Sequence, residues 1–557
     1  MNFNRLIFLI WFPLVVVAIW VTALWFNSLT SYLSAFDGAP IDQTQPNRRR
    51  SVDEKRAMTI AFVQKQLQEN PAIPGVSISV VYQNETIIAT GFGTKQHGNK
   101  NTPVTDHTVF QIGSYTKTFI ALGIGKLVDD GLVQWHDPVQ QHLPWFHLVD
   151  KYAEQYTTLG DLLAMNSVFG EHEGDGPMMG GVFSSERDLV ERMAYLNTTR
   201  PIRAGYAYSN LNFEILGQVI EHVTHQPWFA FIKTTFLDPL GMNDTFGRPA
   251  DVTNMAELSS GHFACKGQVL GPYDITSSMA AFTAGADYLA AASMLSSAAD
   301  LAKFSHFLLN RGRGIFKSAQ IIQEMTTGHT ILANYIDGVD ANAKSFHPDG
   351  GVKAAGYGFD TVGNVMYGYD FYDKTGATLT MHHNNGFVPS QGLGVAITSN
   401  VRMDVWADFY RWERVRAYVL GIFLDVPQVT LDDTWSQALL HVPFPSGMPC
   451  DAYFYRGQTW GRPIPVETQT LLVGTYVATD SPRYNGNLTV FKQGHELMLH
   501  YGAYTKPLLA TLHNPTTEFV WTVDVDASTM VFTLKGLHTS SQTLALSDAA
   551  LFVKATT

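Results

Sequence analysis

The order in which strand-type and helix-type patterns follow one another is the feature that most limits how this chain can fold. Residues 75–82 alternate and carry β-branched side chains, and 86–90 repeat the pattern after a turn, which predicts a hairpin. Apolar residues then recur at helical spacing in 117–132, 211–223, 229–236 and 299–309, and strand patterns return at 377–382 and 394–399. Strands at both ends with helices between them predict an α+β fold, an α/β sandwich. Its antiparallel sheet is flanked by helices and interrupted by a helical insertion.

A second change of pattern near residue 430 divides the chain. Residues 427–465 hold repeated Pro and few periodic stretches, which is typical of a linker. The residues after 465 alternate without a helical period and are broken by Gly, Asn and Asp, which predicts a small all-β domain, either a lipocalin-like barrel or a sandwich. We therefore expect a transmembrane signal anchor at 1–30, a linker at 31–51, the α+β domain at 52–428, a linker at 429–465 and the all-β domain at 466–557.

The N-terminus predicts a membrane anchor. No residue from Leu6 to Phe36 is charged, and residues 6–26 are almost entirely apolar or aromatic. About 20 apolar residues in a helix match the hydrocarbon thickness of a bilayer, whereas a cleaved signal peptide usually has a shorter apolar region. An uncleaved signal anchor is favoured over a cleaved signal. The prediction is a single-pass membrane protein held through residues 6–26, with an extracellular or lumenal body.

Net charge, glycosylation triplets and cysteines give further indications about binding partners and cellular compartment. The formal net charge is −12, which argues against nucleic acid because phosphate binding needs clustered Lys and Arg. Four glycosylation acceptor triplets are compatible with a lumenal glycoprotein, although such triplets occur by chance about this often; they begin at Asn84, Asn197, Asn243 and Asn487. Cys265 and Cys450 have no metal-type spacing, and both a disulfide and two buried thiols fit them. The sequence does not indicate an oligomeric state.

The segment Ser114-Tyr115-Thr116-Lys117 is the first that carries chemistry. On a helix, positions i and i+3 share a face, so the Lys117 amine can reach the Ser114 hydroxyl. A serine hydroxyl needs a neighbouring base to become a good nucleophile, and a lysine with a depressed pKa can be that base. Alone the motif is weak, since a helix N-cap serine with an exposed lysine gives the same letters.

Two further motifs add to the first. In Tyr208-Ser209-Asn210, a tyrosine near two lysines can act as base or acid, and the Asn210 amide can hold a lysine and a substrate carbonyl. In Lys374-Thr375-Gly376, the lysine supplies charge, the threonine a hydroxyl for a substrate carboxylate, and the glycine room for close approach. Taken singly, the segment 208–210 also suits the cap of a helix, and the segment 374–376 also suits a turn between strands.

The three motifs in this order, SxxK, YxN and KTG, resemble the serine β-lactamase-related family, which includes class C β-lactamases, DD-peptidases, esterases and D-aminopeptidases. The resemblance extends over about residues 55–425. It includes the segments 110–117 (FQIGSYTK), 127–132 (LVDDGL), 208–211 (YSNL), 238–242 (DPLGM), 297–302 (SAADLA) and 357–359 (YGF). The all-β domain resembles the small barrel that follows this domain in some D-aminopeptidase-like relatives.

The resemblance implies a serine hydrolase that forms an acyl-enzyme on Ser114, and the apolar N-terminus makes the predicted enzyme membrane-anchored. It makes Lys117 and Tyr208 the groups that shuttle the proton, and Lys374 the charge that stabilises the Tyr208 phenolate and attracts anionic substrate. It assigns substrate binding to Asn210, Thr375, Gly376 and Ala377. The backbone N–H groups of Ser114 and Ala377 would form the oxyanion hole. No metal or other cofactor is implied, and the substrate is a small molecule or peptide: a peptide, amide, lactam or ester.

Two segments depart from the family pattern and leave the substrate open: 165–172 (MNSVFGEH) and 379–383 (LTMHH). The adjacent His382 and His383 face opposite sides of a strand, so a metal pair is disfavoured. The polar segment 171–176 is interpreted as a solvated loop, with substrate contact or weak calcium binding as alternatives. A catalytically weak scaffold or binding protein that keeps the fold is the competing function, and a receptor that uses residues 466–557 is a third.

Overall fold

The computed structural model describes residues 49–265, 268–276, 288–332, 353–403, 411–437, 461–511, 514–522, 529–536, 542–546 and 550–555. Residues 51–557 form one compact unit.

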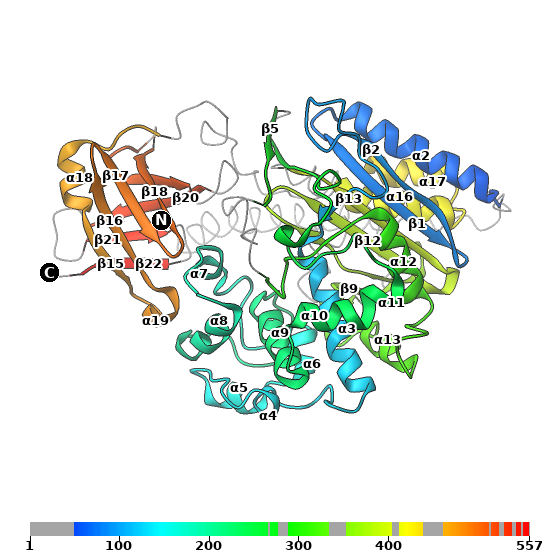
Figure 1. Cartoon of the computed structure of the whole chain (residues 1–557), viewed down its shortest axis with the longest axis horizontal. Coiled ribbons are helices and arrows are strands. Elements are labelled where there is room, and N and C mark those ends of the chain that lie inside the picture. The colour runs from blue at the N-terminus through cyan, green and yellow to red at the C-terminus, as the bar shows by residue number, and fades with distance from the viewer. Residues whose placement is uncertain are drawn as a thin grey trace, which may run out of the picture. The chain divides into compact units, whose positions relative to one another are not determined.

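The central sheet joins the two ends of the predicted α+β domain. Its strand order is β2-β1-β13-β12-β10-β9-β8-β7, with β11 also paired to β12. The neighbours β1 and β13 are antiparallel, from Val76 opposite Ser399 to Tyr82 opposite Leu393, and Figure 1 shows the blue β1–β2 hairpin beside β12 and β13. The α+β prediction is therefore confirmed. The strands are β1 (Gly75–Tyr82), β2 (Glu85–Gly93), β7 (Thr330–Ile331), β8 (Ala354–Ala355), β9 (Thr361–Met366), β10 (Tyr369–Asp373), β11 (Gly376–Ala377), β12 (His382–Val388) and β13 (Leu393–Ser399).

Both faces of this sheet are covered, because alternate residues of a strand point to opposite sides. Val395 and Ile397 of β13 belong to one apolar cluster, while Ala396 between them belongs to the other. The first cluster includes α16 (Arg411–Phe423) and is flanked by α2 (Val52–Glu69) and α17 (Gln428–Gln437). Residues 428–437 thus form a helix where the sequence predicts the start of a linker; residues 438–460 lie outside the described residues.

The second apolar cluster contains the helical insertion. Helix α3 is buried along almost its whole length because it is apolar on all sides, and it packs against α9, α10 and α13. The helices are α3 (Thr116–Asp129), α4 (Val139–His142), α5 (Lys151–Tyr156), α6 (Leu159–Leu163), α7 (Asp175–Met179), α8 (Glu186–Arg192), α9 (Leu211–Thr224), α10 (Trp228–Ile232), α11 (Asp238–Leu240), α12 (Ala298–Leu309) and α13 (Gln320–Met325). Short strands accompany them: β3 (Phe110–Gln111) with β6 (Leu295–Ser296), and β4 (Gly261–Cys265) with β5 (Gln268–Tyr273) and β14 (Val401–Met403).

One predicted strand is wrong in its interior. Residues 377–382 were expected to run as a single strand, but β11 ends at Ala377 and β12 begins at His382. Between them the Thr378 amide donates to the Met381 carbonyl, and the Thr378 hydroxyl accepts from the Met381 amide at 3.1 Å. Threonine side chains that bond nearby backbone in this way favour a turn over a continued ladder.

The C-terminal part is a closed barrel of eight strands, as the alternating pattern predicts. Aromatic side chains, among them Tyr476, Trp521 and Phe552, fill its interior, as they do in small closed barrels. Tyr484 instead joins the core of the helical insertion, and its hydroxyl donates to the Gly174 carbonyl at 3.1 Å. The elements are α18 (Val466–Leu472), β15 (Gly474–Ala478), α19 (Pro482–Asn485), β16 (Asn487–Gln493), β17 (Glu496–Tyr501), β18 (Tyr504–Ala510), β19 (Glu518–Thr522), β20 (Thr529–Lys535), β21 (Thr543–Leu546) and β22 (Ala550–Lys554).

The predicted localisation needs correction. Within the described ranges, no helix combines the length and the apolar character needed to cross a bilayer, which contradicts a single-pass membrane protein. The longest, α2, carries charges throughout, including Asp53, Glu54 and Lys55. The predicted span at residues 6–26 lies outside the described residues. The glycosylation triplets are not tested and stay predictions.

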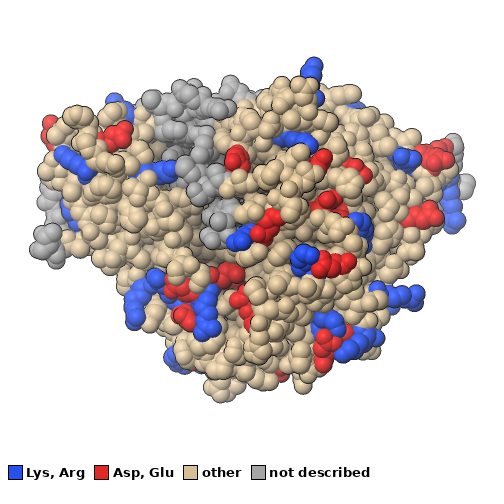
Figure 2. All heavy atoms as spheres, in the orientation of Figure 1, with Lys and Arg blue, Asp and Glu red and all other residues tan. Residues whose placement is uncertain are grey.

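On the face shown in Figure 2, basic and acidic side chains are interspersed and do not gather into a basic stripe. The expectation that nucleic acid is not a partner stays a prediction.

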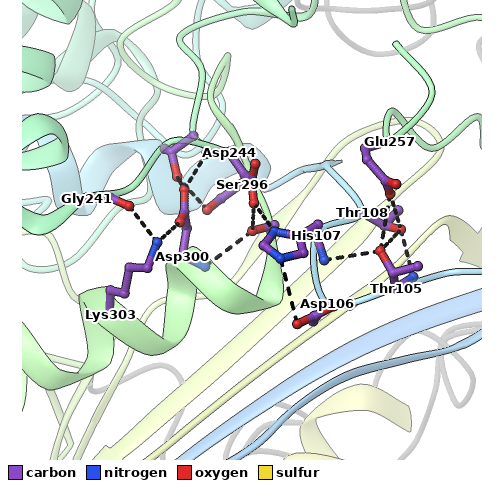
Figure 3. A network of polar contacts seen from close by, with 12 residues as sticks. Thr105, Asp106, His107, Thr108, Gly241, Asp244, Glu257, Ser296, Asp300 and Lys303 are labelled. Atoms are coloured by element: carbon purple, nitrogen blue, oxygen red, sulfur yellow. Dashed lines mark hydrogen bonds and ion pairs between the residues drawn. The ribbon is translucent and has the colours of Figure 1, made fainter. Parts of the chain in front are cut away.

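A polar network fixes the chain just before β3 (Figure 3). His107 Nδ1 lies 2.7 Å from Asp244 Oδ2, and the Asp244 amide donates to Asp300 Oδ2 at 2.6 Å. Lys303 of α12 bonds the other oxygen of Asp300 at 2.8 Å. The network ties the segment that leads to β3 to the start of α12, and so helps to position the residues that follow β3.

This network predicts a pH-dependent contribution to stability. The hydrogen bond that the Asp244 carboxylate accepts is the main cause that raises the pKa of His107, and burial acts against it. A raised pKa means that the stabilisation is complete below the ordinary pKa of 6.5 and is lost as the pH rises through the higher folded-state value. His107→Gln should therefore destabilise the protein more at about pH 6 than at about pH 8.5 in urea unfolding. The exposed His136→Gln is the control; equal losses at both pH values for His107→Gln would contradict the expectation.

Candidate active site

Ser114 lies in a 3-10 turn, Gly113–Tyr115, which leads directly into α3. The Thr116 hydroxyl donates to the Gly113 carbonyl at 2.7 Å and closes this turn. Gly113 has φ +51°, and a Cβ placed there would come within 2.7–2.9 Å of backbone atoms of Ala377. Glycine therefore permits both the turn and the close approach of β11 to the Ser114 segment.

Lys117 follows Ser114 by one helical turn and is fully buried. Its Nζ donates to Ser114 Oγ at 3.1 Å, to Asn210 Oδ1 at 2.7 Å and to the Ala291 carbonyl at 2.9 Å. These three acceptors use all three hydrogens of an ammonium group. The neutral amine would have one lone pair in the same place, available to accept the Ser114 proton.

Tyr208 contacts the same hydroxyl from the segment before α9. Its Oη lies 2.7 Å from Ser114 Oγ, and Lys374 Nζ lies 3.4 Å from Tyr208 Oη. Both lysine ammonium groups also lie 5.0 Å from the centre of the Tyr208 ring. The four predicted catalytic residues thus form one connected cluster around Ser114 Oγ.

The pKa shifts suit proton transfer. Burial is the main cause that lowers the pKa of Lys117, and the charge of Lys374 lowers it further, although Tyr208 acts in the opposite direction. Burial alone would raise the pKa of Tyr208, but the charges of Lys117 and Lys374 outweigh it and bring that pKa below 10.0. Two groups whose lowered pKa values favour their proton-accepting forms therefore contact Ser114 Oγ.

Asn210 connects this cluster to α7. While its Oδ1 accepts from Lys117, its Nδ2 donates to Asp175 Oδ2 at 2.6 Å. The same carboxylate oxygen lies 2.9 Å from His172 Nδ1, and the His172 ring lies 5.3 Å from that of Tyr208. Asn210 thus makes the contact with Lys117 that its predicted role requires. Asp175 lies in the segment 171–176, which was interpreted as a solvated loop; it is instead buried and bonded to Asn210.

The third motif lies in a gap between two short strands. β10 ends at Asp373 and β11 begins at Gly376, and both pair with β12. Asn385 of β12 replaces the missing ladder bonds, since its side chain donates to the Lys374 carbonyl at 2.5 Å and accepts from the Lys374 amide at 3.1 Å. A fully buried ion pair between Asp373 and Arg416, 2.7 Å apart, holds the preceding residue.

Asp360, at the residue after the 357–359 segment, engages this motif. Its two oxygens lie 2.8 and 2.9 Å from Lys374 Nζ. Oδ2 also accepts from the Thr375 amide at 3.2 Å and from the Thr375 hydroxyl at 3.3 Å. Burial acts to lower the pKa of Lys374, but the charges of Asp360 and Tyr208 outweigh it, so that pKa is raised. Lys374 is therefore a fixed positive charge next to Tyr208.

The remaining predicted residues lie on β11. Gly376 and Ala377 pair with His383 and His382, and a Cβ on Gly376 would come within 1.9 Å of the Ile112 carbonyl oxygen. β11 is thus packed directly against the turn that holds Ser114, which brings Ala377 close to the nucleophile segment. The oxyanion hole at the Ser114 and Ala377 amides stays a prediction.

In the part of the chain that the structure describes, no group of three or more His, Cys, Asp or Glu side chains is placed to hold a metal ion. His383 is buried, lies 2.8 Å from the Thr398 hydroxyl through Nδ1, and stacks on Tyr115 at 4.7 Å. Burial is the main cause that lowers its pKa to about 3. His383 is therefore a neutral packing residue beneath the Ser114 turn.

Comparison with known proteins identifies the family. Residues 62–420 match the model of the family described as Beta-lactamase. The chain belongs to this β-lactamase family. The prediction of a serine hydrolase related to β-lactamases is confirmed at this level of family.

Named relatives of this β-lactamase-family chain cover only part of it. The unguisins hydrolase ungD′ of Aspergillus campestris (strain IBT 28561) is 35% identical over 193 residues, 33% of this chain and 35% of the relative. The protein flp of Staphylococcus aureus (strain COL) is 28% identical over 206 residues, 35% of this chain and 39% of the relative. The chain thus matches little more than a third of the length of these relatives.

Solved structures of low sequence identity share the fold. The octameric penicillin-binding protein homologue from Pyrococcus abyssi aligns with a TM-score of 0.54 at 20% identity, over 89% of this chain and 99% of that chain. The D-amino acid amidase from Ochrobactrum anthropi SV3, complexed with L-phenylalanine, aligns with a TM-score of 0.52 at 20% identity, over 67% of this chain and 98% of that chain.

The electrostatics of the cluster predict the effect of removing Lys374. Its charge lowers the pKa of both Lys117 and Tyr208, so Lys374→Met should raise both values. The rate of a fluorophosphonate reaction at Ser114 should fall by about 10²-fold at neutral pH, the size of one lost electrostatic contact. The acidic limb of the pH–rate profile for this labelling should move to higher pH.

The matched control is Lys55→Met, which removes a buried lysine paired with Asp425 at 2.9 Å. This variant should keep the pH profile of the wild type. An unchanged profile for Lys374→Met would show that its charge does not act on the proton acceptors.

Proposed function

We propose that this β-lactamase-family chain is a serine hydrolase that forms an acyl-enzyme on Ser114 and cleaves a small-molecule or peptide substrate at an amide, peptide, lactam or ester bond. The observation that carries the proposal is the pair of contacts on Ser114 Oγ, one from Lys117 and one from Tyr208. Both partners have lowered pKa values, and a hydroxyl held between two such groups is activated as a nucleophile.

In the acylation step, Ser114 Oγ attacks the substrate carbonyl carbon while its proton passes to Lys117 or Tyr208. The carbonyl oxygen becomes an oxyanion, which the backbone N–H groups of Ser114 and Ala377 stabilise. The bond to the leaving group then breaks, and the leaving amine or alkoxide takes up the proton. The product that remains is an ester between the acyl group and Ser114.

Deacylation repeats the sequence with water. A water molecule gives a proton to the same base and attacks the ester carbonyl, and Ser114 Oγ leaves and is reprotonated. The second product is the carboxylic acid. Lys374 stays charged throughout, because the Asp360 carboxylate keeps its pKa high. The site residues are Ser114, Lys117, Tyr208 and Lys374 for catalysis, and Asn210, Thr375, Gly376 and Ala377 for substrate.

We also propose a separation of roles. Residues 52–428 would hold the hydrolase, and 466–557 would form a separate all-β domain. The barrel contributes the Tyr484 contact to Gly174, which directly precedes Asp175. It would therefore support the segment that positions Asn210.

The direct test is covalent labelling of the full chain with a fluorophosphonate and, separately, with a β-lactam. Intact mass and peptide mapping should place the phosphonate on Ser114, and Ser114→Ala should lose labelling and turnover by on the order of 10⁴-fold or more. Ser305→Ala is the matched control, since that buried hydroxyl bonds only within its own helix, to the Leu301 carbonyl at 2.8 Å.

Labelling of folded Ser114→Ala at the wild-type rate would refute Ser114 as the nucleophile. Absence of any adduct on folded wild-type protein would favour the competing function, a scaffold or binding protein that keeps the fold.

A further inference from the structure

The donors of the third motif are already bound to a carboxylate of the chain itself. Asp360 Oδ1 and Oδ2 lie 2.8 and 2.9 Å from Lys374 Nζ, and Oδ2 also accepts from the amide and the hydroxyl of Thr375. Lys374 is 1% exposed and Asp360 is 8% exposed, so the pair is shielded from water. A charge-assisted contact of this kind is strong in a buried setting.

These are the groups expected to hold the carboxylate of an anionic substrate. The family resemblance implies that Lys374 attracts such a substrate, and the motif gives Thr375 a hydroxyl that can bind it. In the structure both point at Asp360, which occupies the place of an external carboxylate. An anionic substrate would have to displace Asp360 or accept a second negative charge beside it, and two neighbouring carboxylates repel each other.

The other lysine of the site does not compensate. The contacts of Lys117 Nζ are to Ser114 Oγ, Asn210 Oδ1 and the Ala291 carbonyl. A further carboxylate, Asp175, bonds Asn210 at 2.6 Å. The two lysines of the cluster are therefore accompanied by two carboxylates of the chain, Asp360 and Asp175.

We propose that Asp360 is a specificity-determining residue that restricts this site to acyl donors without a carboxylate near the scissile bond. The substrate class is then neutral esters, amides and internal peptide bonds, and not peptides cut next to a free C-terminus or β-lactams with their carboxylate. This inference rests on the proposed acyl-enzyme function and narrows its substrate.

The test compares two fluorophosphonates that differ only in a terminal group two carbons from phosphorus, a carboxylate or a carboxamide. Second-order rate constants for labelling of Ser114 are measured on the full chain. The wild type should react at least about tenfold faster with the carboxamide, the effect expected for one unfavourable charge contact. Asp360→Asn frees Lys374 while keeping the side-chain shape, and should shift this ratio by about tenfold toward the carboxylate.

A second readout separates specificity from a structural role. The Asp360 charge raises the pKa of both Lys117 and Tyr208, so Asp360→Asn should move the acidic limb of labelling to lower pH. Asp370→Asn is the matched control: it removes an aspartate of the neighbouring strand whose carboxylate bonds Ser390 at 3.1 Å instead of a site residue. This variant should change neither the ratio of the two labelling rates nor the acidic limb of the pH–rate profile.

The outcomes are distinct. Equal rates for the two probes on the wild type, or a preference for the carboxylate, overturn the inference while Ser114 labelling leaves the proposed function intact. This comparison needs no variant, so it decides the question even when Asp360→Asn does not fold. A ratio that Asp360→Asn leaves unchanged in folded protein removes Asp360 as its cause. Failure of both probes to label Ser114 refutes the proposed function itself, and the inference with it.

Discussion

The burial of Lys117 among three separate segments is the constraint on which the site depends. Its amine bonds the serine on its own helix, Asn210 at the start of α9 and the Ala291 carbonyl, so α3, α9 and the chain near residue 291 must all be in place together. Burial of the Lys117 amine away from solvent is also the main reason that its pKa falls. Packing of the helical insertion and the lowered pKa of Lys117 therefore have the same physical origin.

The second lysine shows the opposite use of burial. Lys374 is as deeply enclosed as Lys117, yet the Asp360 carboxylate raises its pKa and keeps it charged. One lysine is thus suited to exchange a proton and the other to supply a fixed field on Tyr208. Two chemically identical side chains acquire different roles from their neighbours alone, which is how paired titratable groups divide acid and base work.

The sequence predicted what depends on local pattern and missed what depends on tertiary contact. The bounds of β1, α9 and β13 follow from periodicity, and the three motifs located the side chains that meet at Ser114 Oγ. Asp360 was missed although it directly follows the 357–359 segment, because its contact with Lys374 forms only in the folded chain. Asp175 was assigned to a solvated loop, since nothing local shows that its carboxylate faces Asn210. The turn at 378–381 was read as strand because threonine and methionine also suit a strand.

Direct titration of Lys117 tests the central claim most closely. ¹³C labelling of lysine side chains with NMR detection, with the Lys117 signal assigned from its loss in Lys117→Met, gives the pKa of this one amine. The account predicts a value below the ordinary 10.5, because the group is buried next to a second cation. A value at or above 10.5 would show that Lys117 stays an ammonium ion and cannot accept the Ser114 proton.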